Sequence, residues 1–202
     1  HGRNQYVLDF SNPQVVEEIF RQMDEILSCG RISYLKWDMN RYISEPFSNY
    51  LGEQAQGELF HRYILGVYAL YEKLLAKYPA LLIESCAGGG GRFDPGLLYY
   101  APQTWASDDT DGVERLKIQY GASMLYPLSS IGGHLSAVPN HQVGRSPGLD
   151  FRSDVALFST YGLELDVTQL TPEELGKVKD AIQTFKLRQD LIHEGKFYRL
   201  IS

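Results

Sequence analysis

The chain has 202 residues, with 19 lysines and arginines against 25 aspartates and glutamates, so its formal net charge is −6. This length is enough for one domain with a sizeable core, and a hydrophobic share of 44% is ordinary for a globular protein. The acidic balance argues against nucleic acid as a partner, and no apolar run approaches the roughly 18 residues that a membrane span needs.

Strand and helix signals alternate along the chain, which predicts a parallel α/β architecture. Residues 5–10 (QYVLDF) are typical of a strand. Asn12 then fits an N-cap with Pro13 at the first helical position, and apolar residues follow at helical spacing. Residues 33–38 (SYLKWD) predict a second strand, and a long helix is expected over residues 54–78.

Four more strands and two more helix starts follow. Asp111 can cap one helix, and Thr171 begins another, with Pro172 at its first position and Glu174 completing a capping box. The six βα-type units suit an incomplete (β/α)8 barrel, and a doubly wound open sheet is the competing architecture. The four later strands are predicted at residues 81–85, 103–107, 129–133 and 162–166.

Polar side chains gather just after the strand ends. In parallel α/β folds this edge carries the active site. Carboxylates from two strand ends can converge on one ligand, and glycoside hydrolysis requires two such groups. The polar positions are Lys36, Asp38, Asn40, Glu84, Cys86, Ser107, Asp108, Asp109, Asp111 and His134.

Other interpretations of these residues remain open. Asp109 and Asp111 could cap a turn or a helix, or the SDDTD run could bind a divalent cation. Residues 88–91 are all glycine without a following Lys-Ser/Thr, so they predict a tight turn near a ligand or another chain segment. His134 and His141 could be ligands, bases or structural residues.

Three motifs, in this order, resemble the bacterial α-galactosidases of glycoside hydrolase family 36. They are YLKWDMNR at residues 34–41, ESCAGGGGRFD at residues 84–94 and WASDDTDGVERL at residues 105–116. Residues 2–13 (GRNQYVLDFSNP) and 130–134 (SIGGH) also resemble that family, so the resemblance covers nearly the whole chain.

The resemblance implies a role for several residues. Asp38 matches the nucleophile at the end of the fourth barrel strand, and Asp108 matches the acid/base at the end of the sixth. The implied reaction is a retaining double displacement on α-galactosides such as melibiose and raffinose. It needs no metal and no organic cofactor. The residues that match sugar-binding positions are Arg3, Lys36, Asn40, Cys86 and Gly89.

The resemblance also implies a partial catalytic barrel, covering about strands 3 to 8, as a single domain over residues 1–202. Family members are longer, with a β-rich domain before the barrel and a β-sandwich after it. We therefore expect the isolated chain to be weakly active or inactive. The exposed barrel edge is a candidate surface for a homo-oligomer. The two cysteines, Cys29 and Cys86, have no CxxC spacing and favour a reducing, cytoplasmic setting.

Competing functions remain at this point. An α-N-acetylgalactosaminidase or a galactosyl transferase could use the same frame. A non-catalytic carbohydrate-binding or structural fragment is an alternative of a different class. A third hypothesis is a metal-dependent phosphotransfer enzyme that uses the SDDTD run.

Overall fold

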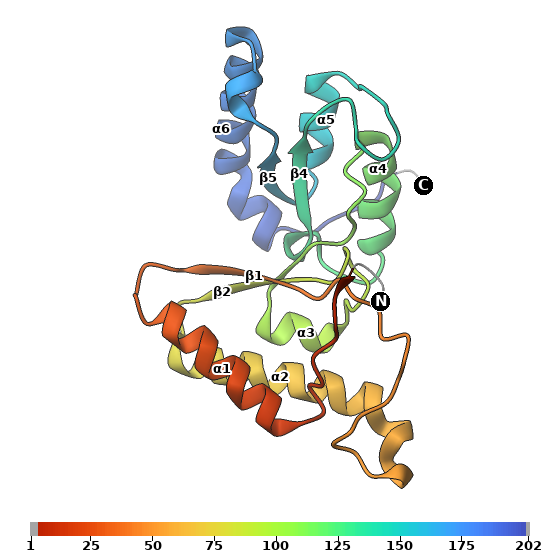
Figure 1. The fold of residues 1–202 in the computed structure, drawn as a ribbon. Helices are drawn as coiled ribbons and strands as arrows, with labels where there is room; N and C mark the ends of the chain where they lie inside the picture. Colours follow the sequence, from red (N-terminus) through yellow and green to blue (C-terminus); the bar gives the residue numbers. More distant parts are fainter. Residues whose placement is uncertain (1–3, 201–202) are drawn as a thin grey trace. The chain divides into compact units, whose positions relative to one another are not determined.

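The structure is a computed structural model that describes residues 4–200, and it is an α/β fold whose paired strands are parallel (Figure 1). The chain divides into two compact units. The first comprises His1–Gly88 and Arg92–Pro102, and the second comprises Gly89–Gly91 and Gln103–Ser202. No helix in the described part of the chain combines the length and the apolar character needed to cross a bilayer.

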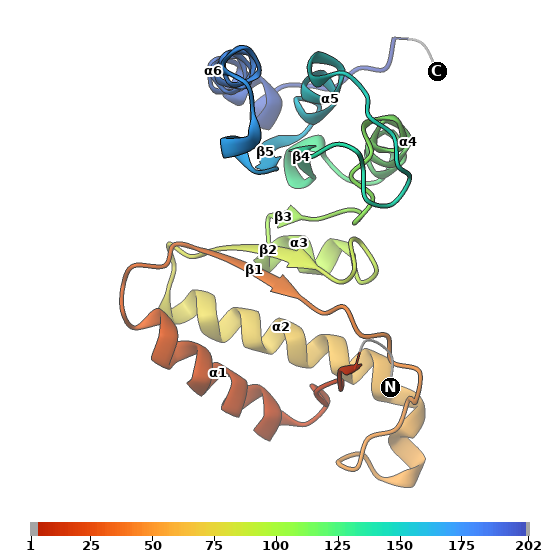
Figure 2. The ribbon, with the colours of Figure 1, turned by 45° about the horizontal axis from the view of Figure 1, so that its top comes forward.

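The first unit begins with helix α1 (Pro13–Leu27), which starts where the sequence predicts. The Asn12 side chain accepts a hydrogen bond from the Gln14 N–H, and Pro13 occupies the first turn. The long helix predicted next begins as a 3-10 segment, η2 (Glu53–Glu58), and continues as α2 (Leu59–Lys77). Figures 1 and 2 show α1 and α2 side by side.

Strands β1 (Tyr34–Asp38) and β2 (Leu82–Cys86) form the parallel pair of this unit. Side chains alternate along a strand, and here Leu35 and Trp37 pack against the hydrophobic cluster of α1 and α2. Lys36 and Asp38 therefore project to the other face of β1. This alternation separates the charged side chains of β1 from its core-facing side chains.

Two local features of this unit differ from the predictions. Residues 5–10 were predicted to be a strand but do not form one, because a strand also needs a backbone partner. A short helix, α3 (Pro95–Tyr100), was not predicted; Asp94 caps it by accepting from the Leu97 N–H. Asp94 followed by Pro95 is the local signal for that start.

The second unit contains a parallel pair, β4 (Gly132–Ser136) with β5 (Thr160–Glu164). Strand β3 (Gln103–Thr104) is only two residues long, although residues 103–107 were predicted. Thr104 forms a parallel bridge with Ile131, which follows the 3-10 segment η3 (Leu128–Ser130).

Three α-helices of this unit lie on one face of β4 and β5 (Figure 2). The capping box at Thr171 and Glu174 is formed as predicted. Leu135, Ala156 and Val178 form the buried centre between strand and helices. The helical segments are α4 (Gly112–Ala122), α5 (Leu149–Ala156), the 3-10 segment η4 (Val167–Gln169) and α6 (Pro172–Glu194).

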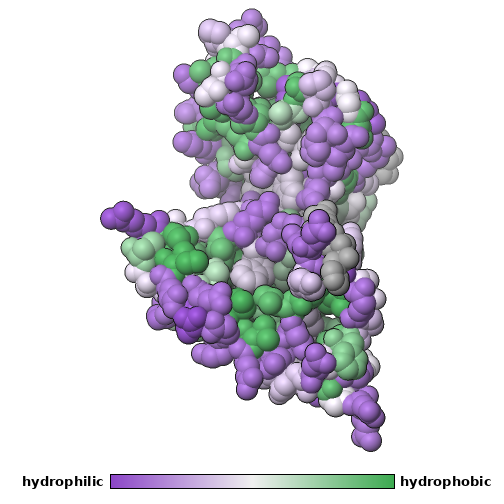
Figure 3. Space-filling view, viewed as in Figure 1, coloured by the Kyte–Doolittle hydropathy of each residue, from purple (hydrophilic) through white to green (hydrophobic). Residues whose placement is uncertain are grey.

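Helix α1 has a charged outer face and an apolar inner face. The outer face of α1 carries exposed charged residues, among them Glu17, Glu18 and Arg21. Figure 3 accordingly shows mainly hydrophilic atoms over this helix. Most apolar side chains of α1, by contrast, belong to the hydrophobic cluster that α1 shares with α2, although Ile26 is exposed.

Candidate active site

Asp38 lies at the carboxyl end of β1, and its side chain is held by Asn40. The Asn40 amide nitrogen donates to Asp38 Oδ2 at 2.6 Å, and Asn40 Oδ1 accepts from the Gly88 N–H at 2.6 Å. Asn40 therefore links the carboxylate to the first glycine of the turn after β2. This donor fixes the orientation of the Asp38 carboxyl group.

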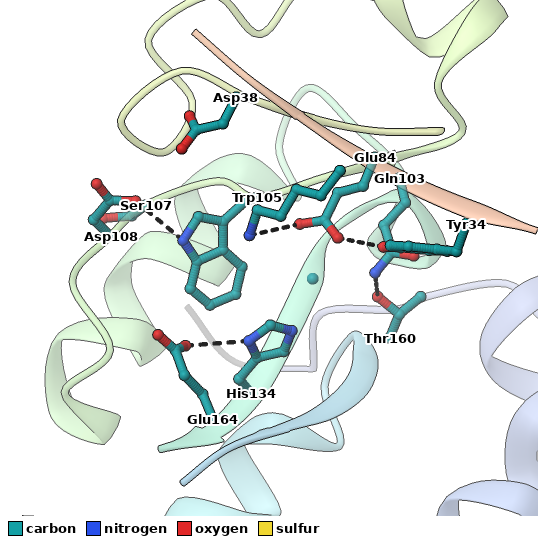
Figure 4. Close-up of polar contacts among 12 residues, drawn as sticks. Tyr34, Asp38, Glu84, Gln103, Trp105, Ser107, Asp108, His134, Thr160 and Glu164 are labelled. Atoms are coloured by element: carbon teal, nitrogen blue, oxygen red, sulfur yellow. Dashed lines mark hydrogen bonds and ion pairs between the residues drawn. The ribbon is translucent and has the colours of Figure 1, made fainter. Parts of the chain in front are cut away.

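Lys36 lies two residues before Asp38 on the same face and pairs with a buried carboxylate. Its Nζ atom is 3.1 Å from Glu84 Oε1, and the Tyr34 hydroxyl donates to the other oxygen, Oε2 (Figure 4). Burial and this hydrogen bond raise the pKa of the Tyr34 phenol well above its ordinary value. The cross-strand register places Lys36 opposite Glu84, so the sheet itself makes this contact.

Cys86 ends β2 and is the register partner of Asp38. It is buried, and its carbonyl accepts from the Met39 N–H at 2.9 Å. The guanidinium of Arg92 donates to the carbonyls of Met39 and Arg41, which fixes the loop after β1. Asp38 and Asn40 also line a cavity of about 350 Å³ in this unit.

The glycine turn contacts another chain segment closely in the second unit. Gly89 has φ +78°, and a Cβ there would lie 2.6 Å from Ser107 Cα. The Gly90 N–H donates to the Ala106 carbonyl at 3.0 Å. Of the two expectations for this turn, contact with another chain segment is what the structure shows. Gly89 is required by both its backbone conformation and this close approach.

Asp108 lies in the loop after β3 and is half-buried. The indole Nε1–H of Trp105 donates to Asp108 Oδ1 at 3.1 Å (Figure 4). His134 stacks on the Trp105 ring, with 4.3 Å between the ring centroids, and its Nδ1 lies 3.2 Å from Glu164 Oε2. His134 thus has structural contacts on both its ring face and its edge.

The remaining acidic residues of the SDDTD run accept hydrogen bonds from backbone N–H groups. Asp109 Oδ1 accepts from the Asp111 N–H at 3.0 Å, and Asp111 caps α4 through the Glu114 N–H. Among residues 4–200 no group of three His, Cys, Asp or Glu side chains could hold a metal ion. The metal-dependent phosphotransfer hypothesis therefore has no ligand cluster in this part of the chain.

The structure places the predicted site residues in two groups. Lys36, Asp38, Asn40 and Cys86 gather at the ends of β1 and β2, and Gly89 lies against the loop that carries Asp108. Arg3 lies outside the described residues. The motifs did not reveal the roles of Glu84, Tyr34 and Trp105. Glu84 and Tyr34 come from different motifs and contact each other only across the β1–β2 pair. The role of Trp105 depends on the direction in which its indole N–H points.

The sequence profile of the Melibiase family matches residues 1–195. The chain belongs to this family. The match covers the segments that carry Asp38, Cys86 and Asp108, so it agrees with the resemblance to family 36 in the sequence.

One relative, compared by its sequence and by the structures of two of its variants, shows how much of the family this chain covers. The α-galactosidase AgaA of Geobacillus stearothermophilus is 50% identical over 201 residues, which are 100% of this chain and 28% of that protein. A variant of AgaA with raffinose bound has a TM-score of 0.96 and 49% identity to this chain. A second variant, with stachyose bound, has a TM-score of 0.95 and 49% identity; both structures cover 100% of this chain, which spans 28% of theirs.

Proposed function

We propose that this chain supplies both catalytic carboxyl groups of a retaining α-galactosidase, with Asp38 as the nucleophile and Asp108 as the general acid/base. Both residues lie at or just after the carboxyl ends of strands. The observation that carries the proposal is a spacing. The two Geobacillus variants with raffinose and stachyose each have one aspartate replaced, and those aspartates are 70 positions apart, as are Asp38 and Asp108.

The proposed reaction has two steps. Asp38 attacks the anomeric carbon while Asp108 gives its proton to the glycosidic oxygen, and a covalent β-galactosyl ester forms. Asp108, now a carboxylate, then takes a proton from water, and that water displaces Asp38 to give the α-configured product. Such a mechanism requires the two carboxyl groups to be about 5–5.5 Å apart in the assembled barrel.

The barrel is part of the same proposal. In each unit the helices cover one face of a parallel strand pair, as in the wall of a (β/α)8 barrel (Figure 2). We assign the chain to about strands 3 to 8 of one catalytic domain. The faces of β1 and β2 that carry Lys36 and Glu84 would then line the barrel interior.

The substrate-binding residues follow from the contacts within each unit. Glu84 binds the ammonium group of Lys36, which lies on the same face of β1 as Asp38. From this face the ammonium group can donate to a sugar hydroxyl. Asn40 and Cys86 flank Asp38, and the Gly89 backbone adjoins the Asp108 loop. Arg3 is retained as a sugar contact on the resemblance alone. The substrate class is terminal α-galactosides of the raffinose and stachyose type.

Azide rescue tests both assignments at once in the protein that carries this chain. In Asp108→Gly, azide should intercept the β-galactosyl ester and give α-galactosyl azide. In Asp38→Gly, azide should attack the substrate directly and give β-galactosyl azide. Asp109→Gly, the adjacent carboxylate, serves as the control and should give no azide product. The same anomer from both variants, or no azide product from either, contradicts the proposal.

A further inference from the structure

Within the described second unit, Trp105 donates a hydrogen bond to the Asp108 carboxyl group. Its Nε1–H donates to Oδ1 at 3.1 Å (Figure 4). The indole N–H is a donor and never an acceptor, so Oδ1 must present a lone pair to it. In a protonated carboxyl group the carbonyl oxygen is the better acceptor, so the proton belongs on the other oxygen, Oδ2.

Trp105 is itself held tightly. The Arg115 guanidinium carbon lies 4.3 Å from the centroid of the Trp105 ring, and the His134 ring stacks on the same indole at 4.3 Å. Trp105 is 4% exposed and Arg115 2%. A cation and an aromatic ring packed on one buried indole restrict its rotation more than apolar contacts alone.

Arg115 is anchored by the backbone of the same region. Its guanidinium donates to the Gly132 carbonyl at 2.7 Å and to the Ser107 carbonyl at 3.4 Å. Ser107 directly precedes Asp108. The Arg115 guanidinium packs on Trp105 and also binds the loop that carries Asp108. The same side chain therefore contacts the residue that donates and the loop of the residue that accepts.

The backbone at two glycines lies close to the rings of Trp105 and His134. A Cβ at Gly132 would lie 3.1 Å from Cε3 of Trp105, and a Cβ at Gly162 would lie 2.6 Å from Cδ2 of His134. The space beside each ring is therefore already filled by backbone. Close packing of this kind restricts the orientation of the Trp105 ring and so of its N–H group.

We propose that Trp105 is the positioning residue for the acid/base: it fixes Asp108 so that Oδ1 stays an acceptor and Oδ2 delivers the proton. This inference rests on the proposed function. As the C1–O bond breaks, the proton on Oδ2 moves to the glycosidic oxygen, which keeps the bonding pair. The negative charge left on Asp108 is stabilised by the indole N–H, and in the second step Oδ2 takes the proton from water.

The kinetic test uses Trp105→Phe in the protein that carries this chain. Phenylalanine keeps an aromatic ring for stacking but removes the N–H. For raffinose, whose leaving group needs the acid, kcat should fall about 10- to 100-fold, as expected for a lost hydrogen bond to a charged group. For a dinitrophenyl α-galactoside, whose leaving group needs no proton, the fall in the first step should be within about threefold. An equal loss on both substrates means a structural role and overturns the proposal.

A second measurement keeps Trp105 intact. In the protein that carries this chain, the Trp105 indole Nε1–H signal of a ¹⁵N spectrum is identified as the one that Trp105→Phe removes. Asp108→Asn should shift the Trp105 signal. Asp109→Asn, the matched control, should leave it in place. An unmoved signal in Asp108→Asn overturns the inference.

These outcomes separate this inference from the proposed function. If azide fails to rescue Asp108→Gly, the assignment of the acid/base fails and this inference fails with it. If azide rescues that variant but Trp105→Phe loses rate equally on both substrates, the acid/base assignment stands and Trp105 is structural.

Discussion

The Nζ atom of Lys36 lies 3.1 Å from Oε1 of Glu84, on the neighbouring strand and at the same register position. The Lys36 side chain is 39% exposed, whereas that of Glu84 is 5% exposed. A buried carboxylate thus holds a flexible and partly exposed ammonium in one place. The proposed sugar-binding lysine depends on a residue that need not touch the sugar.

Glu84→Gln should therefore weaken substrate binding more than catalysis. A neutral amide holds the ammonium less firmly, and the Lys36 side chain can move into solvent. We expect KM for raffinose to rise about 10-fold, which corresponds to about 1.4 kcal/mol, with a smaller change in kcat. Tyr34→Phe removes the other partner of Glu84 and is the matched control, with a smaller rise in KM. A fall in kcat at unchanged KM would assign Glu84 a different role.

Asn40→Ala should lower kcat about 10- to 100-fold, because Asp38 loses a hydrogen bond to its charged form. Asn40→Asp should be worse, since it places a second carboxylate beside Asp38. Steady-state kinetics on raffinose measure both effects. If Asn40→Ala raises KM and leaves kcat unchanged, Asn40 contributes to sugar binding alone and its hydrogen bond does not act on the nucleophile.

Gly89→Ala should destabilise the protein by about 1–3 kcal/mol, because Gly89 has a positive φ and a Cβ would meet the Ser107 backbone. Gly121→Ala is the matched control in α4, where a Cβ meets nothing within 4 Å. That change should stabilise by about 0.5–1 kcal/mol through helix propensity. Chemical denaturation measures both free energies of unfolding. Equal effects of the two alanines would contradict the close contact at Gly89.

Arg145→Gln should have a pH-dependent effect on the melting temperature. Hydrogen bonds from Arg145 and Lys117 hold the pKa of Glu114 below its ordinary 4.5. A carboxyl whose folded pKa is lowered stabilises the fold above its unfolded pKa and loses that contribution as the pH falls through the folded value. The Tm gap between wild type and Arg145→Gln should therefore be widest near neutral pH and narrow below 4.5.

Arg188→Gln provides the control for that experiment, because Arg188 is an exposed arginine of α6 and the charge change is the same. Its Tm gap should be small and vary little over this pH range. If the gap of Arg145→Gln instead widens as the pH falls, the ion pair with Glu114 does not contribute in the way the structure indicates.

The helix starts could be predicted from the sequence because each depends on a few adjacent residues. Asn12 with Pro13, Asp111, and Thr171 with Glu174 all act as expected. Strand positions were less certain, since pairing is not local. Residues 5–10 were predicted to be a strand and are not one, and β3 is shorter than the strand predicted at residues 103–107.

The site shows the same division. The motifs place Asp38 and Asp108 at strand ends. In the structure Asp38 ends β1, whereas Asp108 lies in the loop after β3, which ends at Thr104. The bond from Trp105 to Asp108 could not be predicted, because the direction of an indole N–H depends on packing by Arg115 and His134. Strand alternation predicts the face of the strand on which Lys36 and Glu84 each lie. The β1–β2 register, which places them opposite each other, could not be predicted.

The most direct test of the account is to identify the residue that forms a covalent bond with the sugar. A 2-deoxy-2-fluoro galactosyl donor with a good leaving group slows the second step of a retaining enzyme, so the ester accumulates and survives proteolysis. In the protein that carries this chain, mass spectrometry should find the adduct on the peptide containing Asp38, and Asp108→Gly should still form it. An adduct on any other residue of a protein that hydrolyses raffinose would contradict the account.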